Sequence, residues 1–291
     1  MIALTDTIDE VRYESAVHEA RSALNLEQPR VGAGSSTGGQ WTVTATSSTK
    51  KEEEEPVTGS SDDGLKQQPV KAATAAEKKV ARRVISLQRA GKERAANKIL
   101  KKYGKSPSQQ LAFLARGVED DVRSLLKGGL SLEPRENMNV RAQIVQLAMV
   151  PRETLRWLGS RGVNVRLGEK SAGEMAAITD AEVAKAWGGI KLDQVGGLYL
   201  SGKKTALAGG ESGRDGIITH ELGHALGFET GLHEQPDWLA AHQASGIFAF
   251  ENGPQELFAQ ATMYWWTSGY KTVEAFAGKA VADFMRAKVK R

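Results

Sequence analysis

The sequence predicts a helix-dominated α+β protein with a small sheet, preceded by a basic helical region and a disordered linker. Three observations predict this class. Long segments carry apolar residues at helical spacing, two short segments read as strands, and one polar segment has almost no large apolar residues. Only 40% of the 291 residues are apolar, slightly below the globular norm, so part of the chain is expected to lie outside a core.

We expect four regions along the chain. Residues 1–28 form a short helix, 29–72 a disordered Gly/Ser/acidic linker, 73–150 a basic helical region, and 151–291 the final α+β domain. The linker contains "PRVGAGSSTGGQWT" followed by an acidic, polar stretch. Such a segment cannot bury enough apolar surface to offset the entropy of ordering.

The basic helical region opens with a concentration of positive charge. Residues 71–105 hold twelve Lys or Arg and two Glu, a net charge of +10 in a chain whose total is +4. Alanine-rich apolar spacing predicts helix there, with a break near Gly91. Further helices are expected over 106–129, which starts with Ser-Pro, and over 139–150.

The final domain mixes helices with strands. A helix over 151–162 starts with Pro151 and ends at a glycine. Strands are expected at 163–168 and in a hairpin over 197–210 that turns at 202–204. The remaining helices are expected over 171–189, 215–229, 236–246, 253–266 and 272–291.

The helix over 215–229 contains the strongest chemical signal, "GIITHELGHALGFET". His220 and His224 are one turn apart, so both imidazoles can reach one ion. Glu221 lies beside the first histidine, where it can act as the general base of a zinc peptidase. Because the chain has no cysteine, only His, Asp and Glu remain as strong ligands. The alternative is a buried amphipathic helix that carries two histidines by chance.

A catalytic zinc ion needs a third protein ligand and one open position. The metzincin pattern fails here, because Gly227 fits but Thr230 occupies the position of the third histidine. Glu256 is the preferred candidate, since it lies in the first turn of an otherwise apolar helix, where a carboxylate needs a cation. It could instead be an exposed first-turn acid that favours the helix dipole. The rivals are His233, Glu229, Glu251 and Asp237.

Four segments together resemble the gluzincin domain of the anthrax-lethal-factor-like metallopeptidases, over roughly residues 160–270. These segments are "VNVRLG", "GGLYLSGKKTALAGG", "THELGHAL" and "PQELFAQAT". The resemblance implies a zincin-like metallopeptidase domain that binds Zn²⁺ and cleaves a protein or peptide substrate. It implies His220, His224 and Glu256 as ligands and Glu221 as the general base.

Two positions depart from the pattern of that family. Gln260 stands where a second acid usually follows the third ligand by one turn, which weakens the support of a ligand histidine. No tyrosine precedes Glu256 in "GIFAFENG" to stabilise an oxyanion; the substitutes considered are Tyr264, His233 and His242. Metal binding is therefore better supported than turnover.

The segment "PRVGAGSSTGGQWT" resembles an element near linkers in bacteriophage structural and head-associated proteins. This resemblance implies a phage or prophage origin, a virion-associated or effector-like peptidase, and capsid proteins as partners. The +10 segment at 71–105 allows nucleic-acid contact, although it could equally be a solvated helical face or dock on an acidic partner.

Three functions follow as hypotheses: a zinc endopeptidase, a catalytically silent structural or assembly protein, and a basic nucleic-acid-associated virion protein. We find no signal peptide and no apolar run long enough to span a bilayer. The expected location is the cytoplasm of the bacterial host or the virion, with no membrane contact.

Overall fold

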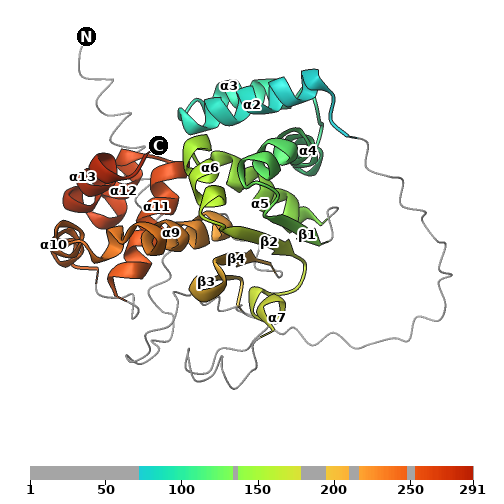
Figure 1. The fold of residues 1–291 in the computed structure, drawn as a ribbon. Coiled ribbons are helices and arrows are strands. Elements are labelled where there is room, and N and C mark those ends of the chain that lie inside the picture. Colours follow the sequence, from blue (N-terminus) through green and yellow to red (C-terminus); the bar gives the residue numbers. More distant parts are fainter. Residues whose placement is uncertain (1–71, 134–136, 178–194, 210–215, 248–252, 291) are drawn as a thin grey trace, which may run out of the picture.

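The computed structural model describes residues 72–133, 137–177, 195–209, 216–247 and 253–290 (Figure 1). The predicted N-terminal helix and the linker up to residue 71 lie outside this part of the chain. So do residues 178–189 of one predicted helix, Asp215 at the start of the motif helix, and the rival ligand Glu251.

The described elements confirm the predicted α+β class, in which helices dominate and one small sheet is present. The first group of helices comprises α2 (Ala75–Arg89), α3 (Glu93–Leu100), α4 (Pro107–Leu125), α5 (Met138–Met149), α6 (Arg152–Ser160) and α7 (Ala172–Ala176). The second group comprises α9 (Ile217–Thr230), α10 (Pro236–Ser245), α11 (Pro254–Thr267), α12 (Tyr270–Ala277) and α13 (Lys279–Lys288), with the 3₁₀ turns η2 (Ser201–Lys203) and η3 (Leu232–Glu234). None of the helices within the described ranges is long and apolar enough to cross a membrane.

The sheet has four strands in the order β1-β2-β4-β3. They are β1 (Leu130–Glu133), β2 (Asn164–Gly168), β3 (Gly197–Leu200) and β4 (Thr205–Ala208). Strand β2 runs parallel to β1 and β4, whereas β3 is antiparallel to β4. The hairpin predicted over 197–210 is therefore present, and β3 is an edge of the sheet beside α9 (Figure 1).

Two elements differ from the sequence prediction. Strand β1 lies within the region expected to be helical, and its Leu130 pairs with Val165 of β2. Four residues carry too little periodicity to reveal a strand, so its partner decides its conformation. The helix expected over 272–291 is broken at Gly278, whose φ of 86° and ψ of 168° suit glycine and end the helical path.

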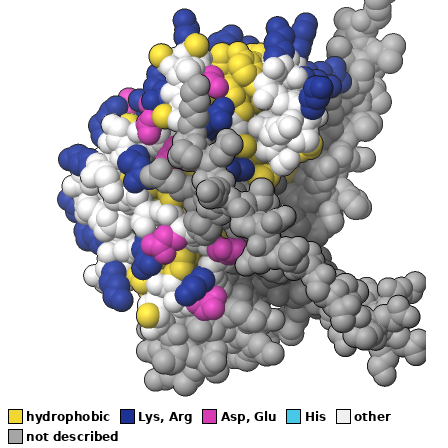
Figure 2. All heavy atoms as spheres, turned by 90° about the vertical axis from the view of Figure 1, so that its right-hand side faces the viewer, with side chains coloured by type: hydrophobic (Ala, Val, Ile, Leu, Met, Phe, Trp, Pro, Cys, Tyr) yellow, Lys and Arg dark blue, Asp and Glu magenta, His cyan; other side chains and the backbone are white. Residues whose placement is uncertain are grey.

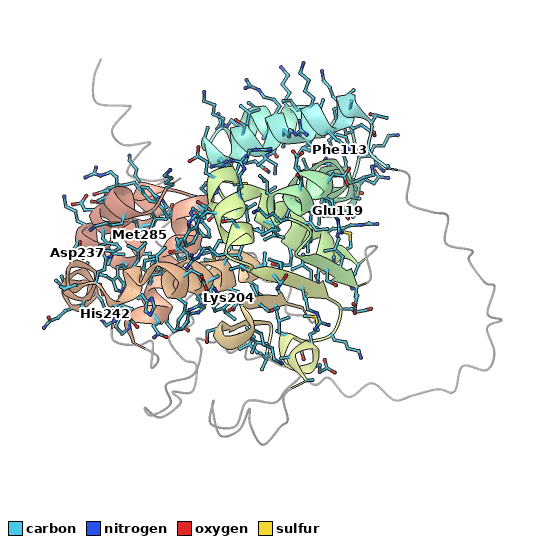
Figure 3. All side chains as sticks on the ribbon, in the orientation of Figure 1. Phe113, Glu119, Lys204, Asp237, His242 and Met285 are labelled. Carbon is cyan, nitrogen blue, oxygen red and sulfur yellow. The ribbon has the colours of Figure 1, made fainter. Side chains whose placement is uncertain are left out.

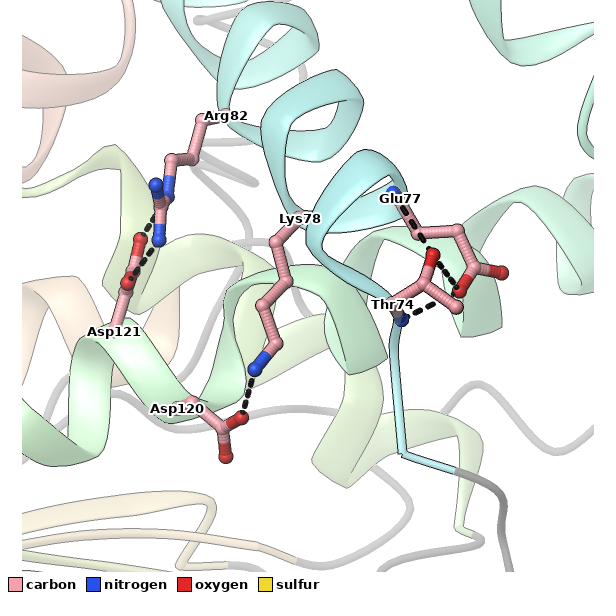
Figure 4. A network of polar contacts seen from close by, with 6 residues as sticks. All are labelled: Thr74, Glu77, Lys78, Arg82, Asp120 and Asp121. Carbon is pink, nitrogen blue, oxygen red and sulfur yellow. Dashed lines mark hydrogen bonds and ion pairs between the residues drawn. The ribbon is translucent and has the colours of Figure 1, made fainter.

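A capping box begins α2, and ion pairs attach this helix to α4 (Figure 4). The side chain of Thr74 accepts from Glu77 N, and the Glu77 carboxylate accepts from Thr74 N, which begins the helix. Lys78 pairs with Asp120 at 2.6 Å, and Arg82 pairs with Asp121. Part of the positive charge predicted for this segment is therefore used in packing against α4.

One main hydrophobic cluster extends from α2 to the end of α13. It includes Ala81 and Leu114 from the first helices, Val165 from the sheet, and Leu222 and Trp266 from the later helices. Its members lie on both sides of the predicted boundary between residues 150 and 151. That boundary stays a prediction.

Candidate metal centre

Helix α9 carries the H-E-x-x-H motif and is buried along most of its length. Its start has no side-chain cap of its own, but Ile218 N donates to the buried Gln143 Oε1 of α5 at 3.0 Å. Its end is closed by Gly231, which has a φ of 68° and whose N–H bonds to the carbonyl of Gly227 at 2.8 Å. Both ends of the motif helix are thus held by identifiable contacts.

Helix α11 crosses α9 at very short range and brings Glu256 to the two histidines. At the crossing, a Cβ on Gly223 would lie 2.8 Å from the backbone of Ala259, so only glycine allows this approach. Glu256 lies one turn before Ala259 in α11. The carboxylate of Glu256 therefore reaches the histidines because the two helix backbones nearly touch.

His220, His224 and Glu256 converge on one point. The Nε2 atoms of the histidines are 3.1 Å apart, and they lie 3.3 and 3.2 Å from the two oxygens of Glu256. Two ligands of one tetrahedral zinc ion, each at roughly 2.0–2.1 Å from it, are about 3.4 Å apart. Among the residues that the structure describes, this is the one group of three His, Cys, Asp or Glu side chains that could hold a metal ion.

The electrostatics of this cluster fit a bound cation. All three residues are at most 2% exposed, and neither oxygen of Glu256 has a partner in hydrogen-bond geometry. Burial alone would raise the pKa of Glu256, but interactions with His224 and His220 keep it below its usual range. Burial lowers the pKa of His220, which favours the neutral imidazole. A buried carboxylate costs free energy that a divalent cation held beside it would offset.

The tautomer of His220 suits a ligand. Its Nδ1 lies 3.1 Å from Gln260 Oε1, and because a carbonyl oxygen accepts, the ring proton is on Nδ1. The Nε2 lone pair then points toward Glu256 and His224. Burial raises the pKa of Tyr264, and an interaction with Gln260 opposes that rise. Gln260 thus supports His220 where the resembled family has an acid, and Tyr264 stands behind Gln260.

Glu221 is buried beside the ligand cluster, between α9 and the edge strand β3. It is 1% exposed, and its Oε2 has no hydrogen-bond partner. A Cβ on Gly197 would overlap Glu221 Oε1, so the glycine leaves the space that the carboxylate uses. Burial, and to a smaller extent the charge of Glu256, raise the pKa of Glu221 well above its usual value. A carboxyl group with a raised pKa is suited to exchanging protons near neutral pH.

The rival ligands within the described residues are engaged elsewhere. Glu229 pairs with Lys204 at 2.9 Å and with Arg161 at 3.3 Å, and Asp237 pairs with Lys288 at 3.0 Å. His233 is packed between the rings of Phe228 and Phe258 and is not a member of the cluster. His242, considered as an oxyanion donor, lies on α10 (Figure 3).

Two supporting residues were not predicted from the sequence. Gln143 anchors the start of α9, as described above, and Trp238 Nε1 donates to the carbonyl of Pro254 at 3.0 Å. Pro254 begins α11, so this bond positions the turn that carries Glu256. A glutamine on an otherwise apolar helix face was the one available signal for Gln143, and no local pattern marks Trp238.

Comparisons with known proteins add little to this geometry. No protein-family model matches the chain, and no curated protein matches it in sequence. One similar solved structure is the Pro-Pro endopeptidase PPEP-2 from Paenibacillus alvei, with a TM-score of 0.41 and 16% identity. The similarity covers 56% of this chain and 98% of that chain. A similarity this low identifies no shared function.

Proposed function

We propose that the chain is a zinc-dependent endopeptidase, with His220, His224 and Glu256 as metal ligands and Glu221 as the general base. One observation carries the proposal: the buried Nε2 atoms of His220 and His224 lie 3.1 Å apart and 3.3 and 3.2 Å from the two oxygens of Glu256, beside a buried carboxylate that follows the first ligand on the same helix. The ligand set of two histidines and one glutamate is one that catalytic zinc uses.

Each residue has a separate role in the proposed reaction. A zinc ion, when bound, polarises a carbonyl oxygen and lowers the pKa of a water molecule toward neutrality. Glu221 takes a proton from the attacking water and returns it to the leaving amine. Gln260 holds the His220 ring in the tautomer that leaves Nε2 unprotonated. The edge strand β3 brings Gly197 against Glu221, which keeps this carboxylate in place.

The test combines metal content with peptide cleavage on purified full-length protein. Wild type should contain one zinc ion per chain, and the variants His220→Ala and Glu256→Ala should contain none. Glu221→Gln should keep the zinc and lose activity by about 10²–10⁴-fold, the usual contribution of a general base. Glu234→Gln, at a side chain that is 74% exposed, is the matched control and should change neither quantity.

The outcomes separate the proposed enzyme from its alternatives. Full activity in Glu221→Gln would contradict the mechanism. Zinc retained by Glu256→Ala would move the third ligand elsewhere. Bound zinc without cleavage of any peptide in a broad library would favour the catalytically silent protein, which the glutamine at position 260 makes a real alternative.

The proposed phage or prophage origin depends on residues 29–42, which lie outside the described part of the chain. Association with a virion and contact with capsid proteins therefore stay predictions. Mass spectrometry of purified virions from a phage that encodes this chain would test them.

A further inference from the structure

The basic region has two faces with different uses. Its inner face is neutralised by α4, through Lys78 with Asp120 and Arg82 with Asp121 (Figure 4). Its outer face is not neutralised in this way. Eight exposed cations there take part in none of the ion pairs found within the described residues: Lys79, Arg83, Lys92, Arg94, Lys98, Lys101, Lys102 and Lys105. Side chains on α2 and α3 extend away from the body of the protein at the top of Figure 3.

At the end of this outer face, the turn from α3 to α4 forms an open hollow of about 720 Å³. Nine residues line it: Lys101, Lys102, Tyr103, Gly104, Lys105, Gln109, Ala112, Phe113 and Arg116. Four of them are cationic and none is acidic. One terminal nitrogen of the Arg116 guanidinium pairs with Glu77 at 3.2 Å. The buried Nε of Arg116 has no hydrogen-bond partner. The hollow therefore offers positive charge to an anionic ligand.

An aromatic platform lies among these cations. Tyr103 is 42% exposed, and its ring stacks on that of Phe113 with centroids 4.3 Å apart and an interplanar angle of 19°. Phe113 is buried, so it supports the tyrosine from within the protein. Lysines around an exposed, supported aromatic ring are the combination that binds single strands: cations hold phosphates, and the ring stacks on a base.

We propose that the α3–α4 turn binds single-stranded nucleic acid, with Lys101, Lys102 and Lys105 on the phosphates and Tyr103 stacked on a base. A duplex would hide its bases from the ring, and an acidic peptide would use the lysines but leave Tyr103 without a role. Figure 2 shows Lys and Arg side chains along the upper edge of one face, where α2 and α3 lie, so a strand can continue over further cations. This site is separate from the metal centre and does not depend on the proposed peptidase.

The experiment measures binding of the full chain to a fluorescent 20-nucleotide oligothymidylate by anisotropy between 50 and 300 mM salt. The triple variant Lys101→Gln/Lys102→Gln/Lys105→Gln should bind at least about 10-fold more weakly. Its slope of log affinity against log salt should be shallower by about 2, since each phosphate contact on a single strand contributes roughly 0.7. Tyr103→Ala should weaken binding by about 5-fold or more with the slope unchanged, and Tyr103→Phe should bind as wild type does.

Matched controls keep the result specific. Lys127→Gln/Lys203→Gln/Lys271→Gln removes the same charge at exposed sites away from the turn and should leave binding within about 2-fold. Circular dichroism checks that each variant is folded, and a chelator-treated sample should bind as the untreated one does. Three results would each overturn the proposal. These are an equal loss of oligonucleotide affinity in both triple variants, no binding by wild type, and an affinity that Tyr103→Ala leaves unchanged. Poly-glutamate binding as tightly as the oligonucleotide would indicate an acidic protein partner instead.

Discussion

Single residues around His220 decide whether the metal centre is held in a productive form. A ligand histidine usually donates its second ring proton to a carboxylate or carbonyl, which orients the ring. Here Gln260 Oε1 accepts that proton from His220 Nδ1 at 3.1 Å. A neutral amide makes the His220 ring less electron-rich than a carboxylate would. We therefore expect zinc to bind less tightly here than at a site with a carboxylate at position 260.

Changing Gln260 tests this arrangement. Gln260→Ala should weaken zinc binding by about 10–100-fold, the usual effect of losing a bond to a ligand histidine. Gln260→Glu should restore or tighten binding, because its carboxylate accepts the same proton. Competition with a zinc-binding dye measures the affinity. Equal affinity in wild type and Gln260→Ala would show that the ring is oriented by other contacts.

At the scale of elements, the crossing of α9 and α11 sets the distance between the ligands. Gly223 lies between the two histidines and faces the backbone of Ala259. A side chain at this position must push the helices apart, and Glu256 would move with α11.

Gly223→Ala should therefore lower zinc affinity and also destabilise the fold by about 1–3 kcal/mol, the usual cost of overpacking a core. Zinc titration and urea unfolding measure the two effects. Gly202→Ala is the control, because a Cβ there meets no atom within 4 Å. An unchanged zinc affinity in Gly223→Ala would mean that the crossing adapts without moving Glu256.

A second contact between elements joins the end of α9 to α6 and to the turn between β3 and β4. Burial alone would raise the pKa of Glu229, but hydrogen bonds from Lys204 and Arg161 keep it below its usual range. The same carboxylate adds to the effect of burial on Tyr199, whose pKa is raised to about 12. A carboxyl with a lowered pKa stabilises the fold above its unfolded-state pKa, and this contribution is lost as pH falls through the folded-state value.

Glu229→Gln should consequently lower the free energy of unfolding by about 1 kcal/mol at pH 7, since the partners are largely exposed. The difference between variant and wild type should shrink as pH falls below the ordinary glutamate pKa of about 4.3, where the carboxyl of the unfolded chain takes up a proton, and it should vanish below the lowered folded-state pKa. Urea unfolding at pH 7, 5 and 3.5 measures the free energy of unfolding of both proteins and so gives this difference. A difference that stays constant over this range would assign the effect to packing rather than to charge.

At the scale of the whole molecule, one hydrophobic cluster connects the basic helices to the metal centre. Helix α5 packs against α9 and supplies Gln143 to its start, so residues on both sides of the predicted boundary at 150–151 support the motif. Helix α5, the last helix of the predicted basic region, is therefore part of the support for the motif helix.

Calorimetry of the full chain should show one cooperative transition, shifted upward by zinc. Free zinc at 100 times its dissociation constant adds about 2.7 kcal/mol, or roughly 5–10 °C for a domain of this size. EDTA should reverse the shift, and Glu256→Ala should show none. Two separate transitions, with zinc affecting one of them, would instead support independent domains divided near residue 150.

Features that depend on neighbouring residues could be predicted from the amino-acid sequence alone. The one-turn separation of His220 and His224, the break at Gly91 and the 197–210 hairpin are local, because helical period and turn chemistry act over a few residues. The proximity of Glu256 to both histidines was a hypothesis at that stage, with four rivals.

Only the tertiary structure decided how distant segments meet. It placed Glu256 at the histidines through the backbone contact of Gly223 with Ala259, gave β1 a partner in β2, and set Tyr103 on Phe113. The physical reason is the same in each case. These contacts join residues that are not neighbours in the chain, and close packing of the helices and strands, rather than local conformational preference, brings them together.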